Sequence, residues 1–207
     1  MKQELFEQYL ADCPIVAILR GITAPELPAV CDILHENGIN LLEIPLNTPG
    51  APEAIAIAAR HCAGRQLVGA GTVLSPEQVR EVKAAGGEFI ISPNTDPDVI
   101  RETVRQDMLS MPGFLTPTEG FVAMAAGAHY LKLFPSGNFG VNYIKNIQKV
   151  IKAPIFAVGG VKQQNLAEFL TVCHGVGIGG SLYKPGKTLE DIRRDAAEFA
   201  KIATSVL

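Results

Sequence analysis

A run of five or six mostly apolar residues, followed by a polar or glycine-rich loop, occurs eight times along this chain of 207 residues. Such runs, with no polar alternation, are typical of parallel strands that are buried on both faces. Segments with apolar residues at helical spacing separate most of the runs. This alternation predicts a parallel sheet covered by helices. The expected strands are residues 15–19, 41–46, 67–71, 88–92, 108–112, 129–134, 154–159 and 175–179.

Start signals place helices between these strands. The first dozen residues carry apolar side chains at helical spacing, so they are expected to form a short helix. This helix is expected to cap one end of the barrel into which the strands are expected to close. Thr23 and Pro25 are expected to begin the next helix, which ends near Gly38. Further helices are expected over 52–62, from Ser75, over 96–106, over 116–126, from about 163, and from about 189 to the end.

Eight such units close most naturally into a (β/α)8 TIM barrel with a short N-terminal helix, and we expect residues 1–207 to form one domain. A doubly wound open sheet is the alternative. That fold would usually carry a glycine-rich G-x-G-x-x-G turn after its first strand, and AILRGITAPE has none. The pattern therefore favours the barrel.

Composition excludes several function classes. The net charge of -3 provides no basic stripe for nucleic acid, and the four histidines and four cysteines show no metal-ligand spacing. We find no signal peptide and no apolar segment long enough to span a bilayer. We expect a cytoplasmic protein with reduced thiols, no metal and no membrane partner.

Two charged residues interrupt the apolar strands. Strand alternation places Lys132 on the face opposite Leu131 and Leu133, and it places Glu43 on the same face as Leu41. Both side chains should therefore point into the barrel. A lysine that loses hydration there has a lowered pKa and can act as a nucleophile through its neutral amine. The alternatives are an edge-strand lysine that prevents aggregation and a purely structural buried ion pair.

The carboxyl ends of barrel strands build the active site, so the residues at these ends are candidates for binding. Arg20 ends the first strand, Thr72 follows the third, and Pro93 follows the fourth. Glycine pairs follow the last two strands and could present backbone N–H groups to a phosphate. The candidates there are Gly159, Gly160, Gly180 and Ser181. Arg20 could instead be a solvated charge, Thr72 a helix cap, and the glycines tight turns.

The candidate residues lie in seven short motifs, most of them at strand ends. In chain order these motifs are AILRGI, LLEIPLNTP, GAGTVL, ISPNT, LKLFPS, FAVGGV and GIGGSLY. Together they resemble the 2-keto-3-deoxy-6-phosphogluconate and 2-keto-3-deoxy-6-phosphogalactonate aldolases, which are class I, homotrimeric barrel enzymes. The resemblance implies a Schiff base on Lys132 and general acid/base catalysis by Glu43. It also implies a sugar-acid phosphate substrate, pyruvate and glyceraldehyde 3-phosphate as products, a homotrimer, and no metal or organic cofactor.

Departures from the family pattern separate its two branches. In the phosphogluconate branch an arginine lies four residues after the glutamate, where this chain has Asn47. Arg20 and Val158 resemble the phosphogalactonate branch, so Arg20, with Thr72, is expected to bind the substrate carboxylate. Asn47, Pro93 and Val158 are expected to line the pocket. Relaxed specificity for both epimers remains open, as do a sugar-phosphate isomerase or epimerase and a sugar-phosphate sensor.

Overall fold

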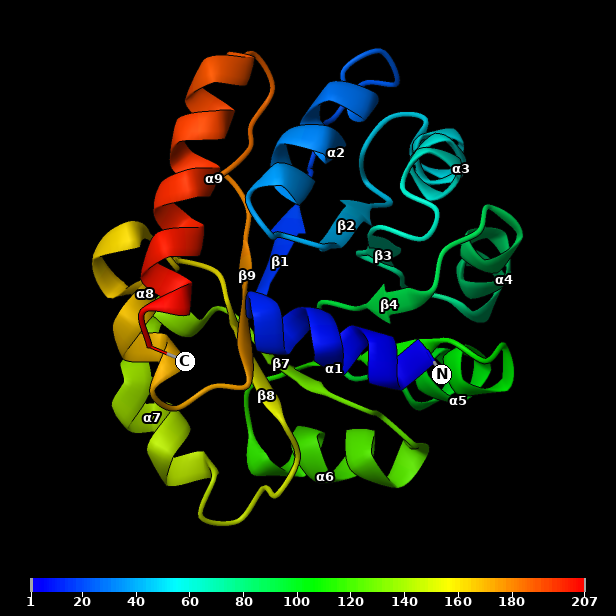
Figure 1. Ribbon diagram of the computed structural model, residues 1–207. Helices are drawn as coiled ribbons and strands as arrows, with labels where there is room; N and C mark the ends of the chain where they lie inside the picture. The colour runs from blue at the N-terminus through cyan, green and yellow to red at the C-terminus, as the bar shows by residue number, and fades with distance from the viewer. Residues whose placement is uncertain (1, 207) are drawn as a thin grey trace.

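The computed structural model describes residues 2–206, and its strands form one parallel sheet in the order β5-β4-β3-β2-β1-β9-β8-β7-β6 (Figure 1). The strands are β1 (Ile15–Ile18), β2 (Leu41–Pro45), β3 (Leu67–Gly71), β4 (Phe89–Ile91), β5 (Leu109–Met111), β6 (Gly113–Phe114), β7 (Leu131–Leu133), β8 (Ile155–Val158) and β9 (Gly175–Ile178). β5 and β6 lie at the two ends of this order but are joined in the chain through Pro112. The sheet therefore curves into a nearly closed TIM-like barrel, as predicted.

Helices surround this ring. They are α1 (Lys2–Asp12), α2 (Leu27–Glu36), α3 (Ala51–His61), α4 (Pro76–Ala84), α5 (Pro97–Arg105), α6 (Pro117–Ala126), α7 (Gly140–Ile147), α8 (Gln163–Leu170) and α9 (Leu189–Thr204), with the short 3-10 helix η1 (Ser136–Asn138) after β7. Asp96 and Thr116 cap α5 and α6, because their side chains accept hydrogen bonds from the first turn of each helix.

The fifth predicted strand, residues 108–112, differs from the observed structure. The chain pairs with β4 through Leu109–Met111, passes Pro112, and then pairs with β7 through Gly113 and Phe114. Pro112 has no N–H to donate to a sheet ladder, and its carbonyl instead accepts a hydrogen bond from the Lys132 amide at 2.9 Å. The predicted strand thus corresponds to β5 alone, and β6, beyond Pro112, was not predicted.

Two helix predictions need correction. α2 begins at Leu27 rather than near Thr23, because Thr23 and Glu26 form a separate turn that precedes the helix. The segment between β7 and β8 holds η1 and α7, which the sequence analysis did not assign.

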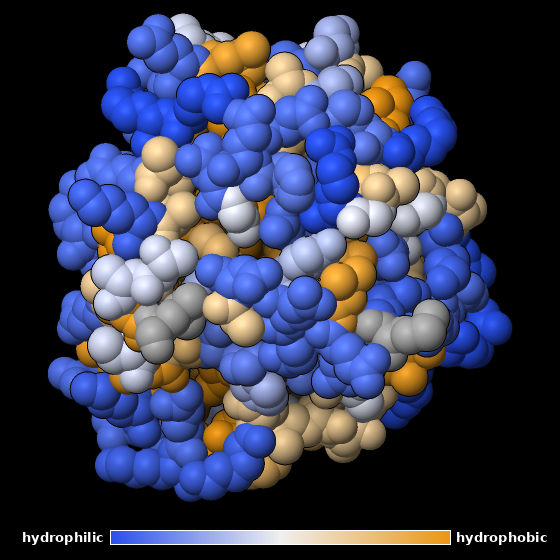
Figure 2. Space-filling model, in the orientation of Figure 1, coloured by the Kyte–Doolittle hydropathy of each residue, from blue (hydrophilic) through white to orange (hydrophobic). Residues whose placement is uncertain are grey.

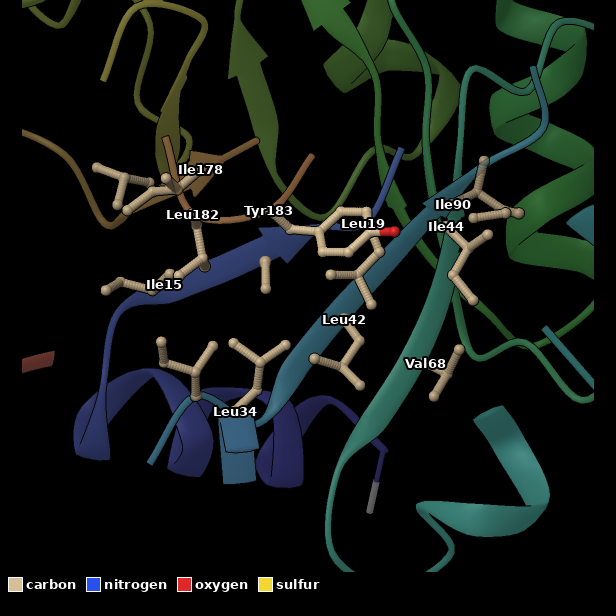
Figure 3. Packing of buried hydrophobic residues seen from close by; sticks show 14 of the residues in the cluster. Ile15, Leu19, Leu34, Leu42, Ile44, Val68, Ile90, Ile178, Leu182 and Tyr183 are labelled. Atoms are coloured by element: carbon tan, nitrogen blue, oxygen red, sulfur yellow. The ribbon is translucent and has the colours of Figure 1, made fainter. Parts of the chain in front are cut away.

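Alternation along the strands separates two cores. Leu42, Ile44 and Val68 point outward and pack under the surrounding helices (Figure 3). Leu41 and Tyr130 belong to the second core, which fills the barrel interior. This confirms the predicted phase of β2 and β7, the strands that carry Glu43 and Lys132.

Helix α1 closes one end of the barrel, as predicted (Figure 1). The fully buried ring of Phe6 packs on Tyr130 at 5.0 Å and on Phe89 at 5.5 Å between ring centroids. Glu7 accepts hydrogen bonds from Tyr130 Oη at 2.6 Å and pairs with His174 Nε2 at 2.8 Å. The surface of this end is mainly hydrophilic (Figure 2). Because Phe89 and Tyr130 lie where β4 and β7 start, α1 covers the amino end of the barrel, and the opposite end remains available for a site.

Candidate active site

A cavity of about 550 Å³ lies at the carboxyl ends of the strands. All predicted site residues except Asn47 line it. They are Arg20, Glu43, Thr72, Pro93, Lys132, Val158, Gly159, Gly160, Gly180 and Ser181. The curvature of the sheet thus gathers residues that are up to 161 positions apart, counted from Arg20 to Ser181.

Lys132 and Glu43 form the buried centre of this cavity. Lys132 is only 6% exposed and Glu43 only 2%. Burial lowers the pKa of Lys132, the negative charge of Glu43 raises it, and the positive charge of Arg20 lowers it. Burial raises the pKa of Glu43, against the opposing effects of Lys132 and Arg20. Both shifts favour the neutral forms, which are the free amine of Lys132 and the protonated carboxyl of Glu43.

Gly71 makes room for the Glu43 carboxylate. A Cβ atom at this position of β3 would lie 1.7 Å from Glu43 Oε1. The other carboxylate oxygen, Oε2, is buried without a hydrogen-bond partner among residues 2–206. An unpaired buried oxygen is costly and is available to a substrate or water. Sequence reasoning missed Gly71, although an inward glycine beside an inward glutamate was a usable signal.

Phe134 contacts the lysine from the same strand end. Lys132 Nζ lies 4.9 Å from the centroid of the Phe134 ring, which also lines the cavity. The peptide bond between Phe134 and Pro135 is cis. A cation over an aromatic face is stabilised by the ring, so Phe134 favours a positive charge on this nitrogen.

Asn47 lies outside the cavity lining, which corrects the prediction that it lines the pocket. Its side-chain amide oxygen accepts a hydrogen bond from Nη1 of the Arg20 guanidinium at 2.7 Å. Thr48, the next residue, accepts a hydrogen bond from the Gly21 amide at 2.9 Å. The loops after β1 and β2 are therefore tied together, and Asn47 orients Arg20 at the cavity wall.

Thr72 is one of two non-glycine residues with positive φ within residues 2–206, at 57°. This conformation is unfavourable for a threonine, and such strain is concentrated at functional sites. Thr72 does not cap a helix, because Ser75 caps α4 by accepting a hydrogen bond from the Gln78 amide. Thr72 instead lines the cavity, as predicted.

Three carbonyl groups of the turn after β8 accept hydrogen bonds from other parts of the chain. Gly159 O accepts from the Gly137 amide at 2.8 Å, Gly160 O from Asn165 Nδ2 at 3.0 Å, and Val161 O from Ser181 Oγ at 3.0 Å. Within residues 2–206, the amides of Gly159, Gly160, Gly180 and Ser181 donate no hydrogen bond.

These two turns have the character of an anion site. Gly159 and Gly160 adopt φ values of 87° and 80°, which a residue with a side chain rarely adopts. Consecutive unpaired N–H groups form a concavity that suits a phosphate. The hydroxyl proton of Ser181 is directed to Val161 O, so the donor that this residue could offer to an anion is its amide.

Ser136 fixes the first of these turns to the lysine strand. Its fully buried hydroxyl donates to Leu133 O at 2.6 Å and accepts from the Val158 amide at 3.0 Å. The end of β7, which carries Lys132, is thereby held against the end of β8. Ser136 is the last residue of the LKLFPS motif, but no role was predicted for it from the sequence.

Two further cations line the cavity and were missed. Lys162 and Lys184 are exposed and follow β8 and β9. Nothing in their sequence context distinguishes these two residues from other loop lysines, which are usually solvated.

Other kinds of site find no support in the described part of the chain. Residues 2–206 contain no group of three His, Cys, Asp or Glu residues placed to bind a metal ion. Across the same residues, every helix is too short or too polar to cross a membrane.

Comparison with known proteins places this geometry in context. The family model described as KDPG and KHG aldolase matches residues 6–202. A 2-dehydro-3-deoxy-6-phosphogalactonate aldolase from Escherichia coli (strain K12) is 42% identical, with coverage of 94% of this chain and 96% of the relative. The KHG/KDPG aldolase of the same organism is 30% identical, with coverage of 95% and 96%.

Solved structures agree with these sequence matches. A structure of native KDPGal superposes with a TM-score of 0.91 at 41% identity, covering 93% of this chain and 95% of that one. A cube-shaped protein cage, designed by fusing symmetric oligomeric domains, has a TM-score of 0.91 at 41% identity, covering 94% of this chain and 73% of that one. The chain belongs to the KDPG and KHG aldolase family of carbon–carbon lyases.

Proposed function

We propose that this protein is a class I aldolase that cleaves 2-dehydro-3-deoxy-6-phosphogalactonate to pyruvate and D-glyceraldehyde 3-phosphate. The observation that carries the proposal is the buried Lys132 beside Glu43 in a cavity whose rim presents unpaired amides. The name of the 42% identical Escherichia coli relative supports the choice of substrate.

Lys132 is the nucleophile. Its neutral amine, favoured by burial, attacks the C2 carbonyl carbon of the substrate to form a carbinolamine. Loss of water then gives an iminium cation, which accepts the electron pair of the C3–C4 bond when that bond breaks. The phosphorylated aldehyde leaves, and an enamine of pyruvate remains on the lysine. Protonation at C3 and hydrolysis release pyruvate and regenerate the amine.

Glu43 moves the protons. Cleavage of the C3–C4 bond requires removal of the proton from the C4 hydroxyl, and the Glu43 carboxylate accepts it directly or through a water molecule. The same group, now protonated, can return a proton to C3 of the enamine. Burial raises the pKa of Glu43, which makes its protonated form more accessible and so suits the return of the proton.

The two ends of the substrate bind to two different sets of lining residues. Arg20, oriented by Asn47, binds the carboxylate together with Thr72. The amides of Gly159, Gly160, Gly180 and Ser181 bind the phosphate. Pro93 and Val158 contribute apolar surface to the lining. Binding energy at these ends positions the C3–C4 bond against Glu43.

Two measurements test the proposal. Incubation with pyruvate and borohydride should reduce the iminium irreversibly and add its mass to Lys132. An isomerase or epimerase, or a sensor, would show no such adduct. A side-by-side cleavage assay on the galacto and gluco 6-phosphates then tests the substrate. The 30% identical KHG/KDPG aldolase makes the gluco epimer, or both epimers, the second candidate.

We also propose a homotrimer that acts in the cytoplasm, each chain forming one domain. The designed cage, built from symmetric oligomeric domains, supports self-association. The four cysteines are free, and three of them are buried, which fits a reducing compartment. Light scattering at several concentrations would contradict the trimer if it gave the mass of a single chain.

A further inference from the structure

Lys187 comes shortly after the turn that follows β9, and it is not among the residues that line the cavity. Its Nζ atom donates hydrogen bonds to Ser181 O at 3.0 Å and Leu182 O at 2.7 Å. The Lys187 side chain is only 10% exposed. A lysine with so little exposure needs partners for its charge, and two backbone carbonyls supply part of them.

Asp195 on α9 supplies the rest. Its Oδ2 atom lies 2.5 Å from Lys187 Nζ, and the Asp195 side chain is 14% exposed. Arg194, which is largely exposed, contacts the other oxygen of the same carboxylate at 3.2 Å. The ammonium is therefore held between a helix of the outer layer and the carbonyls of the turn.

The turn itself has two chemically distinct ends. Gly179 O accepts hydrogen bonds from the amides of Leu182 and Tyr183 at 2.8 and 2.9 Å, which makes a single tight turn. The unpaired amides of Gly180 and Ser181 lie at its start, and the carbonyls bound by Lys187 lie at its finish. The Leu182 side chain packs into the outer core (Figure 3). Apolar packing and one buried ammonium thus anchor the far side of this turn.

We propose that Lys187 is a positioning residue for recognition of the phosphate, an inference that rests on the proposed function. A carbonyl oxygen that rotated toward a phosphate dianion would repel it, whereas an amide attracts it. Lys187 binds two carbonyls and keeps them away from the cavity, so the preceding amides stay directed at the phosphate. The positive charge at the carbonyl end also balances the dipoles of the turn.

The test compares two aldehydes in the condensation with pyruvate. For the wild type and Lys187→Met, kcat/KM is measured with glyceraldehyde 3-phosphate and with glyceraldehyde. The ratio of the two values should fall about tenfold in the variant, mainly through KM for the phosphorylated aldehyde. The inhibition constant of inorganic phosphate should rise by a similar factor. Lys201→Met on α9 is the matched control, because Lys201 is exposed and lies outside the cavity lining.

A double variant separates positioning from stability. Lys187→Met leaves Asp195 without its buried partner, which by itself could disturb folding. Lys187→Met/Asp195→Asn removes this poorly compensated negative charge but does not restore the bonds to the carbonyls. The inference requires the ratio to stay low in the double variant. Recovery of the ratio there, or a ratio unchanged in Lys187→Met, would overturn it. A wild type that forms no pyruvate adduct would instead refute the proposed function.

Discussion

Gly71→Ala tests whether the space beside Glu43 is essential for catalysis. The added methyl would lie 1.7 Å from Glu43 Oε1, while real Cβ atoms essentially never approach another heavy atom within 3.0 Å. The φ angle of Gly71 is not in the left-handed region, so alanine adds no backbone strain there. The substitution therefore acts through the carboxylate, which must move away by at least 1.3 Å if the backbone stays in place.

The magnitude follows from this displacement. A misplacement of about 1 Å costs on the order of 10²-fold in rate, which corresponds to about 2.7 kcal/mol of activation free energy. We expect kcat/KM for cleavage to fall by about that factor. Lys132 keeps its place, so borohydride should still trap pyruvate on it. Gly71→Ala should thus behave like a variant that lacks the base but retains the nucleophile.

Gly69→Ala is the matched control on the same strand. Its Cβ would lie 2.3 Å from the Phe89 ring, so the steric insult is comparable but remote from Glu43. Overpacking there should lower the free energy of unfolding by about 1–3 kcal/mol with little loss of activity in the folded fraction. The double variant Gly71→Ala/Glu43→Gln should lose no more activity than Glu43→Gln alone. Equal activity losses in the two alanine variants, or additive losses in the double variant, would refute the reasoning.

The remaining predictions concern Lys132, Glu43 and Arg20, which are three of the charged side chains that line the cavity. Lys132→Ala should abolish both cleavage and pyruvate trapping while the circular dichroism spectrum is retained, because the nucleophile has no substitute; a folded variant that still cleaves substrate would exclude the Schiff base. Glu43→Gln should retain trapping but lose about 10²-fold or more in turnover. Because the charge of Glu43 raises the pKa of Lys132, this change should also move the midpoint of trapping against pH to lower pH, and an upward shift would contradict the electrostatic account. Arg20→Ala removes a charge-assisted contact of about 1.5–3 kcal/mol, so kcat/KM should fall by about 10- to 100-fold and pyruvate should bind more weakly. Because Arg20 lowers the pKa of Lys132, the same midpoint should move to higher pH, and unchanged pyruvate binding would assign the carboxylate to other donors.

Local sequence patterns were sufficient for the barrel and for its two central residues. Strand alternation is a property of the backbone alone, so the inward phase of Glu43 and Lys132 could be counted from their apolar neighbours. Carboxyl strand ends meet at one end of a parallel barrel, so the positions of Arg20, Thr72 and the glycine turns at such ends predicted the one cavity that they line.

Local patterns failed where the outcome depended on a balance between neighbours. Thr23 has the chemistry of a helix cap, but its partner Glu26 sits in a separate turn and α2 starts later. Pro112 was included in a predicted strand, but it has no N–H for a sheet ladder. It lies between β5, which pairs with β4, and β6, which pairs with β7.

Contacts between loops were decided only by the tertiary structure. Asn47 was expected in the pocket, yet its amide binds Arg20, which is 27 residues earlier in the chain. The space that Gly71 leaves for Glu43 and the bonds from Lys187 to the turn after β9 are likewise matters of distance between segments. The sequence determined the fold, the inward lysine and the inward glutamate because those follow from the period of each element. It did not determine which loop side chains touch, because closure of the ring and packing of the outer helices set those distances.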